Sequence, residues 1–259
     1  MTDVLSVRPL LTGTQKYDKS WSTHNNGFGT IITAPILAYL IETKNGRILY
    51  DVGCDYNKVI KSETYFQSND FPYGPPQMTQ EQRIPSYLDR LGIRPSDIDL
   101  IFIGHLHYDH VGGIGDFLNS DIHIQKKEIL SVRDNMTPVY FSDDISRLTS
   151  GKMIIMDGDY NVTDGVQAIS TPGHTAGHMS LHIELPKGKP IIICGDAADL
   201  EENIKEEIAP GLCWNDQYQT AISSIQNLKE ISKREHAYLW PSHDFNFFHK
   251  LKSFPDFYN

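Results

Sequence analysis

The chain has 259 residues, of which 39% are hydrophobic and 22% charged, and its 23 basic and 33 acidic side chains give a formal net charge of −10. This composition is typical of a globular protein and excludes a membrane-spanning one, because no apolar run approaches the roughly 18 residues that cross a bilayer. The acidic balance disfavours a nucleic-acid partner. The first nine residues lack the basic and then apolar build of a secretory signal. We therefore expect a cytoplasmic protein with no membrane or nucleic-acid partner. The length allows one or two domains, and we expect a single one over residues 1–259.

Short apolar runs separated by turn residues predict an α/β protein with many strands. An Asn-Gly pair at positions 45–46, between two such runs, predicts a hairpin. Pro85 fits a helix only in its first turn, and Gly92 marks the end of that helix. In chain order, the predicted strands cover residues 35–43, 48–52, 99–103, 122–124, 153–156, 166–170, 179–184, 190–194 and 237–240, and the predicted helices cover 83–91, 126–132 and 216–234.

Side chains that can bind metal ions follow four of these strands, usually beside Gly or Pro. His105 follows strand 99–103, His174 follows strand 166–170, Asp196 follows strand 190–194, and His243 follows strand 237–240. Loops at strand ends are where rigid scaffolds display functional groups. If the four strands lie in packed sheets, their ends share one edge, and we expect the four side chains to meet there.

The segment 105–110 reads His-Leu-His-Tyr-Asp-His. Alternate residues of an extended chain share a face, so His105 and His107 can point toward one metal ion. The chain then turns toward the glycines at 112–113, which lets Asp109 and His110 face a second ion. Imidazole and carboxylate ligands without thiolate suit Zn²⁺, with Mn²⁺, Fe²⁺ or Co²⁺ as alternatives. Four coordinating side chains in six residues argue against an ordinary polar surface loop.

Three later residues complete the predicted ligand set. His174 could complete the first site and His243 the second, while Asp196, with two carboxylate oxygens, could bridge both. Seven ligands would then hold two divalent metal ions, most simply Zn²⁺, with room for a shared water. A two-metal hydrolase needs this arrangement.

The ordered motifs H-x-H-x-D-H, T-P-G-H-T-x-G-H, G-D and S-H-D, spread over residues 35–244, resemble those of the metallo-β-lactamase superfamily. The resemblance implies an α/β fold of the αβ/βα type, a four-layer sandwich of two mixed β-sheets flanked by helices, with the metal ions at one edge. Asp51 matches the superfamily's early aspartate, which supports the ligands without binding metal. Carried over by position, the ligands of one ion are His105, His107 and His174, those of the other are Asp109, His110 and His243, and Asp196 bridges them.

Within the superfamily, the sequence is most similar to the N-acyl-homoserine lactonases, which are quorum-quenching enzymes, and to the related pyridoxolactonase. Asp196 argues against true β-lactamases, which typically carry Cys or Ser there, and the 16 residues after His243 are too few for the glutathione-binding region of glyoxalase II enzymes. The nucleic-acid-processing members usually add a domain and a basic face. One departure from the lactonases is Asp199, which stands where they commonly carry a Tyr that contacts the substrate carbonyl.

The resemblance and the ligand set together predict a metal-dependent hydrolase that opens a lactone ring, with N-acyl-homoserine lactones as expected substrates. Hydroxide held between the two ions would attack the ester carbonyl. Asp109 is a candidate to carry a proton to the departing alkoxide, and Asp199 is a second candidate if it faces the site and burial raises its pKa. A thioesterase or another carboxylic-ester hydrolase is the alternative, followed by a phosphodiesterase and a non-catalytic metal-binding relative.

Two aromatic segments, residues 17–28 and 62–82, are predicted to be loops. Trp21, Phe28, Phe71 and Tyr73 within them are candidates for the walls of an apolar substrate pocket, while ordinary surface anchoring or a homodimer contact are the alternatives. The remaining chemistry-bearing residues are read as structural or supporting; they are His178, His182, Cys54, Cys194, Cys213 and Tyr108.

Overall fold

The computed structural model describes residues 2–134 and 138–259. Eleven strands of this part form two sheets: β1 (Val4–Asp18), β2 (Ile31–Thr43), β3 (Gly46–Tyr50), β4 (Leu100–Phe102), β5 (Asp121–Gln125), β6 (Lys152–Met156), β7 (Tyr160–Thr163), β8 (Val166–Ser170), β9 (Met179–Ile183), β10 (Ile191–Gly195) and β11 (Tyr238–Pro241). The helices are α1 (Tyr56–Ile60), α2 (Ser62–Tyr65), α3 (Ile84–Arg90), α4 (Tyr108–Val111), α5 (Lys126–Asp134), α6 (Ser142–Ser150), α7 (Glu201–Glu206), α8 (Tyr218–Glu235) and α9 (Phe245–Phe248). Short 3₁₀ turns cover Lys19–Trp21, Gln80–Gln82, Pro95–Asp97, Gly112–Asp116 and Trp214–Asp216.

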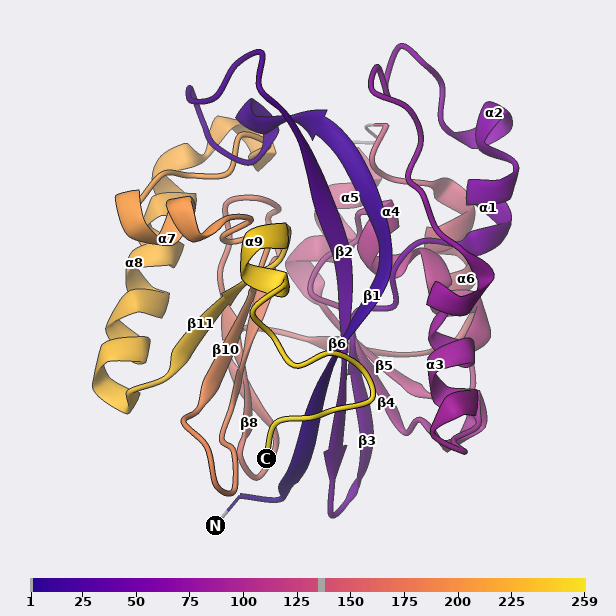
Figure 1. Cartoon of the computed structure of the whole chain (residues 1–259), viewed down its shortest axis with the longest axis vertical. Helices are drawn as coiled ribbons and strands as arrows, with labels where there is room; N and C mark the ends of the chain where they lie inside the picture. Colours follow the sequence, from indigo (N-terminus) through magenta and orange to yellow (C-terminus); the bar gives the residue numbers. More distant parts are fainter. Residues whose placement is uncertain (1, 135–137) are drawn as a thin grey trace.

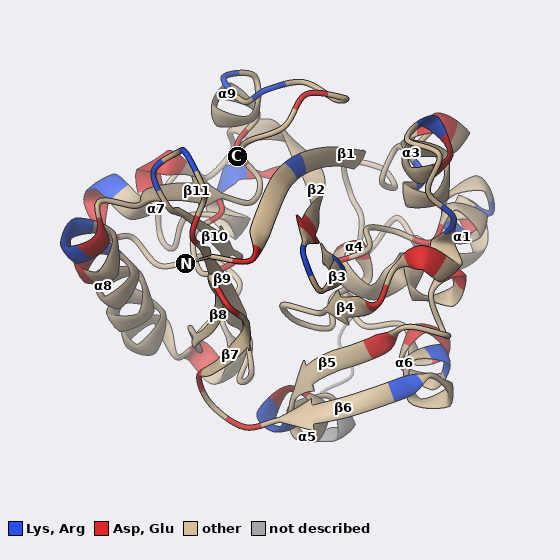
Figure 2. Ribbon diagram, turned by 90° about the horizontal axis from the view of Figure 1, so that it is seen from below, with Lys and Arg blue, Asp and Glu red and all other residues tan. Residues whose placement is uncertain are grey.

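Both sheets are mixed, as predicted. The first has the order β1-β2-β3-β4-β5-β6, antiparallel from β1 to β3 and parallel from β3 to β6. The second has the order β11-β10-β9-β8-β7, with β10 and β11 parallel. Figure 1 shows the sheets packed side by side, with α8 outside the second and α3 and α6 outside the first. Figure 2, turned by 90°, shows the same helix–sheet–sheet–helix order and basic residues interleaved with acidic ones on the helices.

Inner strands such as β4 and β10 are apolar on both faces because both faces are covered. Neighbouring residues of a strand point to opposite sides, so on β4 Phe102 faces the second sheet while Ile101 faces the helices. The core between the sheets includes Tyr39, Tyr50, Phe102, Leu181, Ile193 and Trp240. The outer cores place Leu88 and Leu148 against the first sheet and Leu228 of α8 against the second. In the described part of the chain, no helix is long and apolar enough to cross a membrane.

Strand direction brings the predicted loops to one edge. Strands β8 and β10 both pair antiparallel with β9, and β11 runs parallel to β10, so the carboxyl ends of these three strands lie together. The end of β4, in the other sheet, meets them across the sandwich, because Met179 N donates a hydrogen bond of 3.0 Å to Gly104 O. The predicted shared edge is therefore confirmed.

The largest difference from the predicted elements is β1, a 15-residue strand that pairs with β2 along most of its length. Apolar and polar residues do not alternate cleanly in it, because register shifts at two places change which face each residue occupies. The predicted hairpin at 45–46 and the predicted first-turn position of Pro85 are both present. Predicted ends elsewhere differ by a few residues, as for α8, which begins at Tyr218 rather than Asp216.

A buried ion cluster joins α1 to α6 beside this edge. Lys58 Nζ lies 2.5 Å from Asp144 Oδ1 and 2.8 Å from Asp143 Oδ1, and 4.6 Å from the centre of the Phe141 ring. Lys58 is 2% exposed and Asp144 is fully buried. Phe141 in turn packs on Phe66 and Tyr108, so the cluster supports the aromatic layer next to the predicted metal site.

Candidate metal centre

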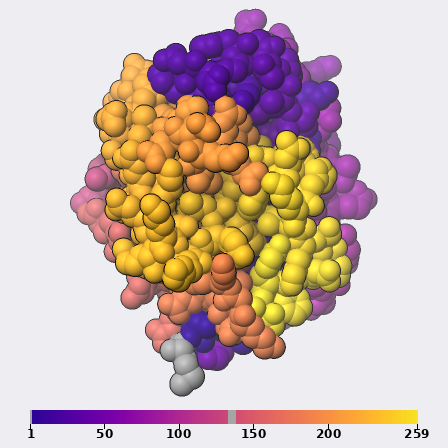
Figure 3. All heavy atoms as spheres, turned by 60° about the vertical axis from the view of Figure 1, so that its left-hand side comes forward, coloured from indigo at the N-terminus to yellow at the C-terminus, as the bar shows by residue number. Residues whose placement is uncertain are grey.

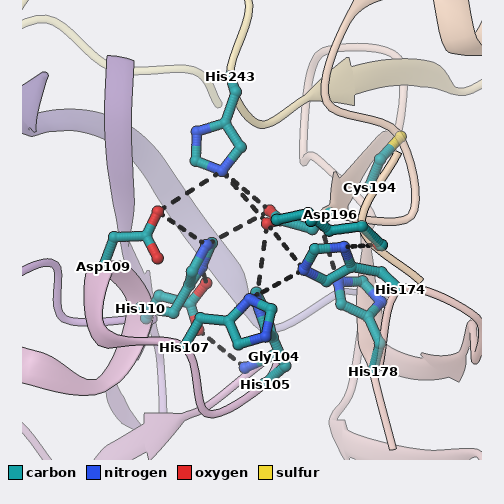
Figure 4. A network of polar contacts seen from close by, with 12 residues as sticks. Gly104, His105, His107, Asp109, His110, His174, His178, Cys194, Asp196 and His243 are labelled. Atoms are coloured by element: carbon teal, nitrogen blue, oxygen red, sulfur yellow. Dashed lines mark hydrogen bonds and ion pairs between the residues drawn. The ribbon is translucent and has the colours of Figure 1, made fainter. Parts of the chain in front are cut away.

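The seven predicted ligands converge, and Figure 4 shows them around one point between the sheets. Ligand atoms of His105, His107, His174 and Asp196 all lie within 4.8 Å of one another, and so do those of Asp109, His110 and His243. Four strand ends supply them: β4 is followed by His105 to His110, β8 by His174, β10 by Asp196 and β11 by His243. Six of the seven are buried, and Asp109 is half-buried.

The carboxylate of Asp196 lies between the two groups. Its Oδ2 is 3.3 Å from His174 Nε2 and 3.6 Å from His105 Nε2, on the side of the first group. Its Oδ1 is 3.2 Å from His243 Nε2 and 3.4 Å from His110 Nε2, on the side of the second. One oxygen therefore faces each group, as a bridging ligand requires.

Hydrogen bonds fix the orientation of the imidazoles. Nδ1 of His110 contacts Asp51 Oδ2 at 2.7 Å, and Nδ1 of His243 donates to Pro35 O at 2.8 Å. His174 Nδ1 likewise donates to Leu212 O at 2.8 Å. In each case Nε2 is left to face the centre. A hydrogen bond from the other ring nitrogen is the usual second contact of a metal-binding histidine.

Asp51 supports the centre without being part of it, as the sequence predicts. Its Oδ1 accepts a hydrogen bond of 2.8 Å from Gly104 N, just ahead of the histidine motif. The residue adopts a left-handed backbone with φ of 58°, which is rare for a residue with a side chain. Gly53, two residues later, shares this conformation, and a Cβ there would lie 2.5 Å from Thr12 Oγ1.

His178 also supports the centre. It belongs to a chain of hydrogen bonds in which each group donates to the next, from Asp196 N to Cys194 O. Asp196 N donates to His178 Nε2 at 2.9 Å, so the ring carries its proton on Nδ1 and donates to Thr171 Oγ1 at 2.8 Å. Thr171 then donates to Ser180, whose hydroxyl donates to Cys194 O. Burial lowers the pKa of His178 to about 3, which keeps the ring neutral.

Sequence reasoning did not find Glu128, which joins the two ligand-bearing loops. This fully buried residue of α5 accepts hydrogen bonds of 3.0 Å from Leu106 N at Oε1 and from Gly177 N at Oε2. Leu106 lies between His105 and His107, and Gly177 lies three residues after His174. A single glutamate in a helix could not be recognised from sequence as the residue that makes such contacts.

The arrangement fits a cation. His105 Nε2, His110 Nε2 and Asp196 Oδ1 are buried and have no hydrogen-bond partner among the described residues, which is costly unless another group is bound there. Burial and the neighbouring imidazoles hold the pKa of His105 well below its usual range, so it is the neutral ligand form. Burial opposes the charging of His243, but the carboxylates of Asp196, Asp199 and Asp109 outweigh it and raise its pKa to about 10. The carboxylates thus stabilise a positive charge at the centre.

A cavity of about 520 Å³ opens onto this centre. Of the predicted wall residues, Trp21 and Phe71 line it, whereas Phe28 and Tyr73 do not. Phe28 is 71% exposed because it stands between two glycines in left-handed conformations, in a turn at the surface. Tyr73 is 40% exposed. The residues that sequence reasoning missed include Gln15, Tyr17, Val139, Tyr140, Leu212 and Trp214.

The wall near Trp21 comes from two distant parts of the chain. Gly211 N donates to Trp21 O at 2.9 Å, and His24 N donates to Ala209 O at 2.9 Å. Figure 3 shows the indigo N-terminal segment resting on the orange segment that carries these partners. Asp199 also lines the cavity, and burial together with Asp196 raises its pKa to about 8.

Comparisons with known proteins agree with this geometry. The sequence model of the metallo-beta-lactamase superfamily matches residues 32–243. An N-acyl homoserine lactonase of a Bacillus species is 36% identical over 88% of this chain and 89% of its own. The N-acyl homoserine lactonase AttM of Rhizobium radiobacter is 26% identical over the full length of both chains. A solved N-acyl homoserine lactone hydrolase, with the product N-hexanoyl-L-homoserine at its catalytic metal centre, superposes with a TM-score of 0.88, at 32% identity over 99% of this chain and all of that one.

Proposed function

The chain belongs to the metallo-beta-lactamase superfamily, and from this premise we propose that it hydrolyses the lactone ring of N-acyl homoserine lactones at a centre of two divalent metal ions. The observation that carries the proposal is Asp196, whose two oxygens face two separate groups of ligands at the floor of the cavity. The similarity to N-acyl homoserine lactonases over most of the chain supports the substrate. Such a substrate has a polar ring and an apolar acyl chain, which matches a polar floor and walls of Trp21, Phe71 and Leu212.

The ligand roles are part of the proposal. His105, His107 and His174 would hold one ion, Asp109, His110 and His243 the other, and Asp196 both. The ions would supply Lewis acidity and lower the pKa of a bound water to near neutrality. Zn²⁺ is the proposed metal, since all seven ligands are imidazole or carboxylate, which suit it.

Opening the ring forms a bond from a water oxygen to the carbonyl carbon and breaks the ring C–O bond. The water loses a proton, and the departing alkoxide needs one. We propose that Asp109 carries it, which is supported by its contacts with His110 Nε2 (3.6 Å) and His243 Nε2 (3.8 Å), because both involve Oδ2. Oδ1 is left to take the proton and pass it to the alkoxide. Asp199 is a second candidate, supported by its position in the cavity wall and by burial, which together with Asp196 raises its pKa to about 8.

The proposed function predicts a metal-dependent lactonase. Protein stripped with a chelator and reloaded with two equivalents of Zn²⁺ should release protons from N-hexanoyl homoserine lactone, and the stripped protein should not. The panel should include a linear ester, a thioester and a bis-aryl phosphate, which test the other activities that the fold hosts. Faster hydrolysis of any of these three, or full lactone turnover with less than 0.1 metal ion per chain, would contradict the proposal.

The role of Asp109 predicts a dependence on the leaving group. Asp109→Asn should lower kcat on the lactone by about 10²–10⁴-fold, the usual contribution of a positioned proton donor. The loss should be much smaller on the matching thiolactone, because a thiolate leaves without needing a proton. Asp116→Asn, at an exposed ion pair with Arg83, is the control and should retain parent rates on both substrates. Equal losses of kcat on lactone and thiolactone would contradict proton transfer by Asp109 and would indicate that the residue acts only as a metal ligand.

A further inference from the structure

Among the described residues that form the potential metal-binding groups, Asp199 is the one that the seven-ligand set leaves out. It lies three residues after Asp196, in the turn that follows β10, and it is 4% exposed. Its backbone oxygen accepts a hydrogen bond of 2.8 Å from His243 N, and Ala198 O accepts one of 3.2 Å from Ser242 N. These bonds hold the side chains of Asp199 and His243 in a fixed relation.

The Oδ1 atom of Asp199 has the same properties as the proposed ligand atoms. It is sealed from solvent and makes no hydrogen bond to any described residue, as is true of His105 Nε2, His110 Nε2 and Asp196 Oδ1. A buried carboxylate oxygen without a partner is costly. A cation held beside Asp196 and His243 would supply the missing partner.

Its position is also that of a ligand. Ligand atoms of Asp196, Asp199 and His243 lie within 4.8 Å of one another. His243 belongs both to this group and to the group that it forms with Asp109 and His110. Through His243, the carboxyl of Asp199 therefore adjoins the second metal site.

The surroundings orient the carboxyl as they would a ligand. The Ser22 hydroxyl interacts with it, and Tyr17 Oη lies 2.8 Å from Ser22 Oγ. The backbone of Ser22 is itself held, because Asn203 Nδ2 donates to Ser22 O at 2.8 Å. Carboxylate ligands of metal ions are usually hydrogen-bonded in this way, which orients them toward the ion.

We infer that Asp199 is an eighth ligand, binding through Oδ1 at the site of Asp109, His110 and His243. The inference rests on the two-metal centre of the proposed function and refines the second site only. That site would then have two imidazole nitrogens and three carboxylate oxygens, counting Asp196. The first site has three imidazoles and the shared carboxylate. Oxygen-rich sites suit Mn²⁺, and imidazole-rich sites suit Zn²⁺, so the second site should accept Mn²⁺ far better than the first.

The test measures metal binding without substrate. Stripped parent protein, Asp199→Asn and Asp199→Ala are titrated with Zn²⁺, Mn²⁺ and Co²⁺ against a chelating dye, with metal content checked by mass spectrometry. The parent should bind two equivalents, the second of them with a smaller preference for Zn²⁺ over Mn²⁺. Both variants should bind the first equivalent normally and the second at least about tenfold more weakly, with the larger loss for Mn²⁺. The visible bands of the second Co²⁺ should intensify, because its coordination number falls.

Two controls keep the result interpretable. Asp89→Asn, at an exposed position of α3, should match the parent in all three titrations. Thermal unfolding of the stripped variants should match the stripped parent, since the asparagine preserves the shape of the side chain. A second equivalent bound with parent affinity and a parent Co²⁺ spectrum would overturn the inference; a loss of lactone turnover in that same variant would assign Asp199 to proton transfer. A chain that binds metal as expected but hydrolyses no lactone would contradict the proposed function and leave the eighth ligand standing.

Discussion

Replacing Asp196 by Asn is expected to lower kcat on the lactone by about 10³-fold or more. Removing a single electrostatic group at a reacting centre costs about 10²–10³-fold, and this substitution affects both ions at once. The amide keeps the shape of the side chain but has one oxygen in place of two. It therefore cannot direct an oxygen toward both the ligand group of His174 and that of His243. Metal content should fall from two ions per chain toward one, measured by mass spectrometry beside the steady-state rates.

The comparison variant is Asp51→Asn, which changes a carboxylate that contacts His110 but belongs to neither ligand group. Loss of such a supporting contact costs about 10–100-fold in metal affinity or activity. The two variants should therefore differ by about a factor of ten or more in kcat. Two tightly held ions and near-parent turnover in Asp196→Asn would show that Asp196 does not bridge.

Replacing Lys58 by Met is expected to cost about 3–5 kcal/mol of unfolding free energy at pH 8, the usual result of removing one partner of a buried ion pair. Asp144 stays fully buried and loses the cation 2.5 Å away. Burial already raises the pKa of Asp144 to about 6 in spite of Lys58, and without Lys58 it should rise further. The measurement is urea unfolding of parent and variant at pH 5 and pH 8.

The direction of the pH effect follows from the raised pKa. An acid whose pKa is higher in the folded chain binds its proton more tightly there, so its favourable contribution is present at low pH and is lost as the pH rises through that pKa. The deficit of Lys58→Met should therefore be smallest at pH 5. The double variant Lys58→Met, Asp144→Asn removes both charges of this pair and should recover most of the loss at pH 8. Equal deficits at both pH values, or a double variant no more stable than the single one, would contradict this account.

The convergence of the seven side chains could be predicted from sequence because their spacing constrains where they lie. His105 and His107 alternate, and each later ligand follows an apolar strand, so strand direction alone brings them together. The four-layer fold was implied by the resemblance of the motifs to the metallo-β-lactamase superfamily, and the apolar strands between covering helices agree with it. The long strand β1 was missed, since its register shifts break the alternation on which a prediction depends.

The cavity walls were predicted less well, because contact between distant loops has no local pattern. Trp21 lines the cavity through backbone bonds to the segment near Gly211, whereas Phe28, seven residues later, turns to the surface. Tyr140 and Trp214 line the cavity from segments to which sequence reasoning assigned no role. Aromatic composition identified the segment 17–28 but not which of its rings faces inward.

The metal centre draws its side chains from both sheets, so neither half of the sandwich can form it alone. A newly made chain would have to dock β4 against the ends of β8, β10 and β11 before any ion found its full coordination. Ions that bind only the docked form favour docking by mass action. Metal binding and docking of the two sheets are thus coupled, so removing the ions should lower the free energy of unfolding of the chain.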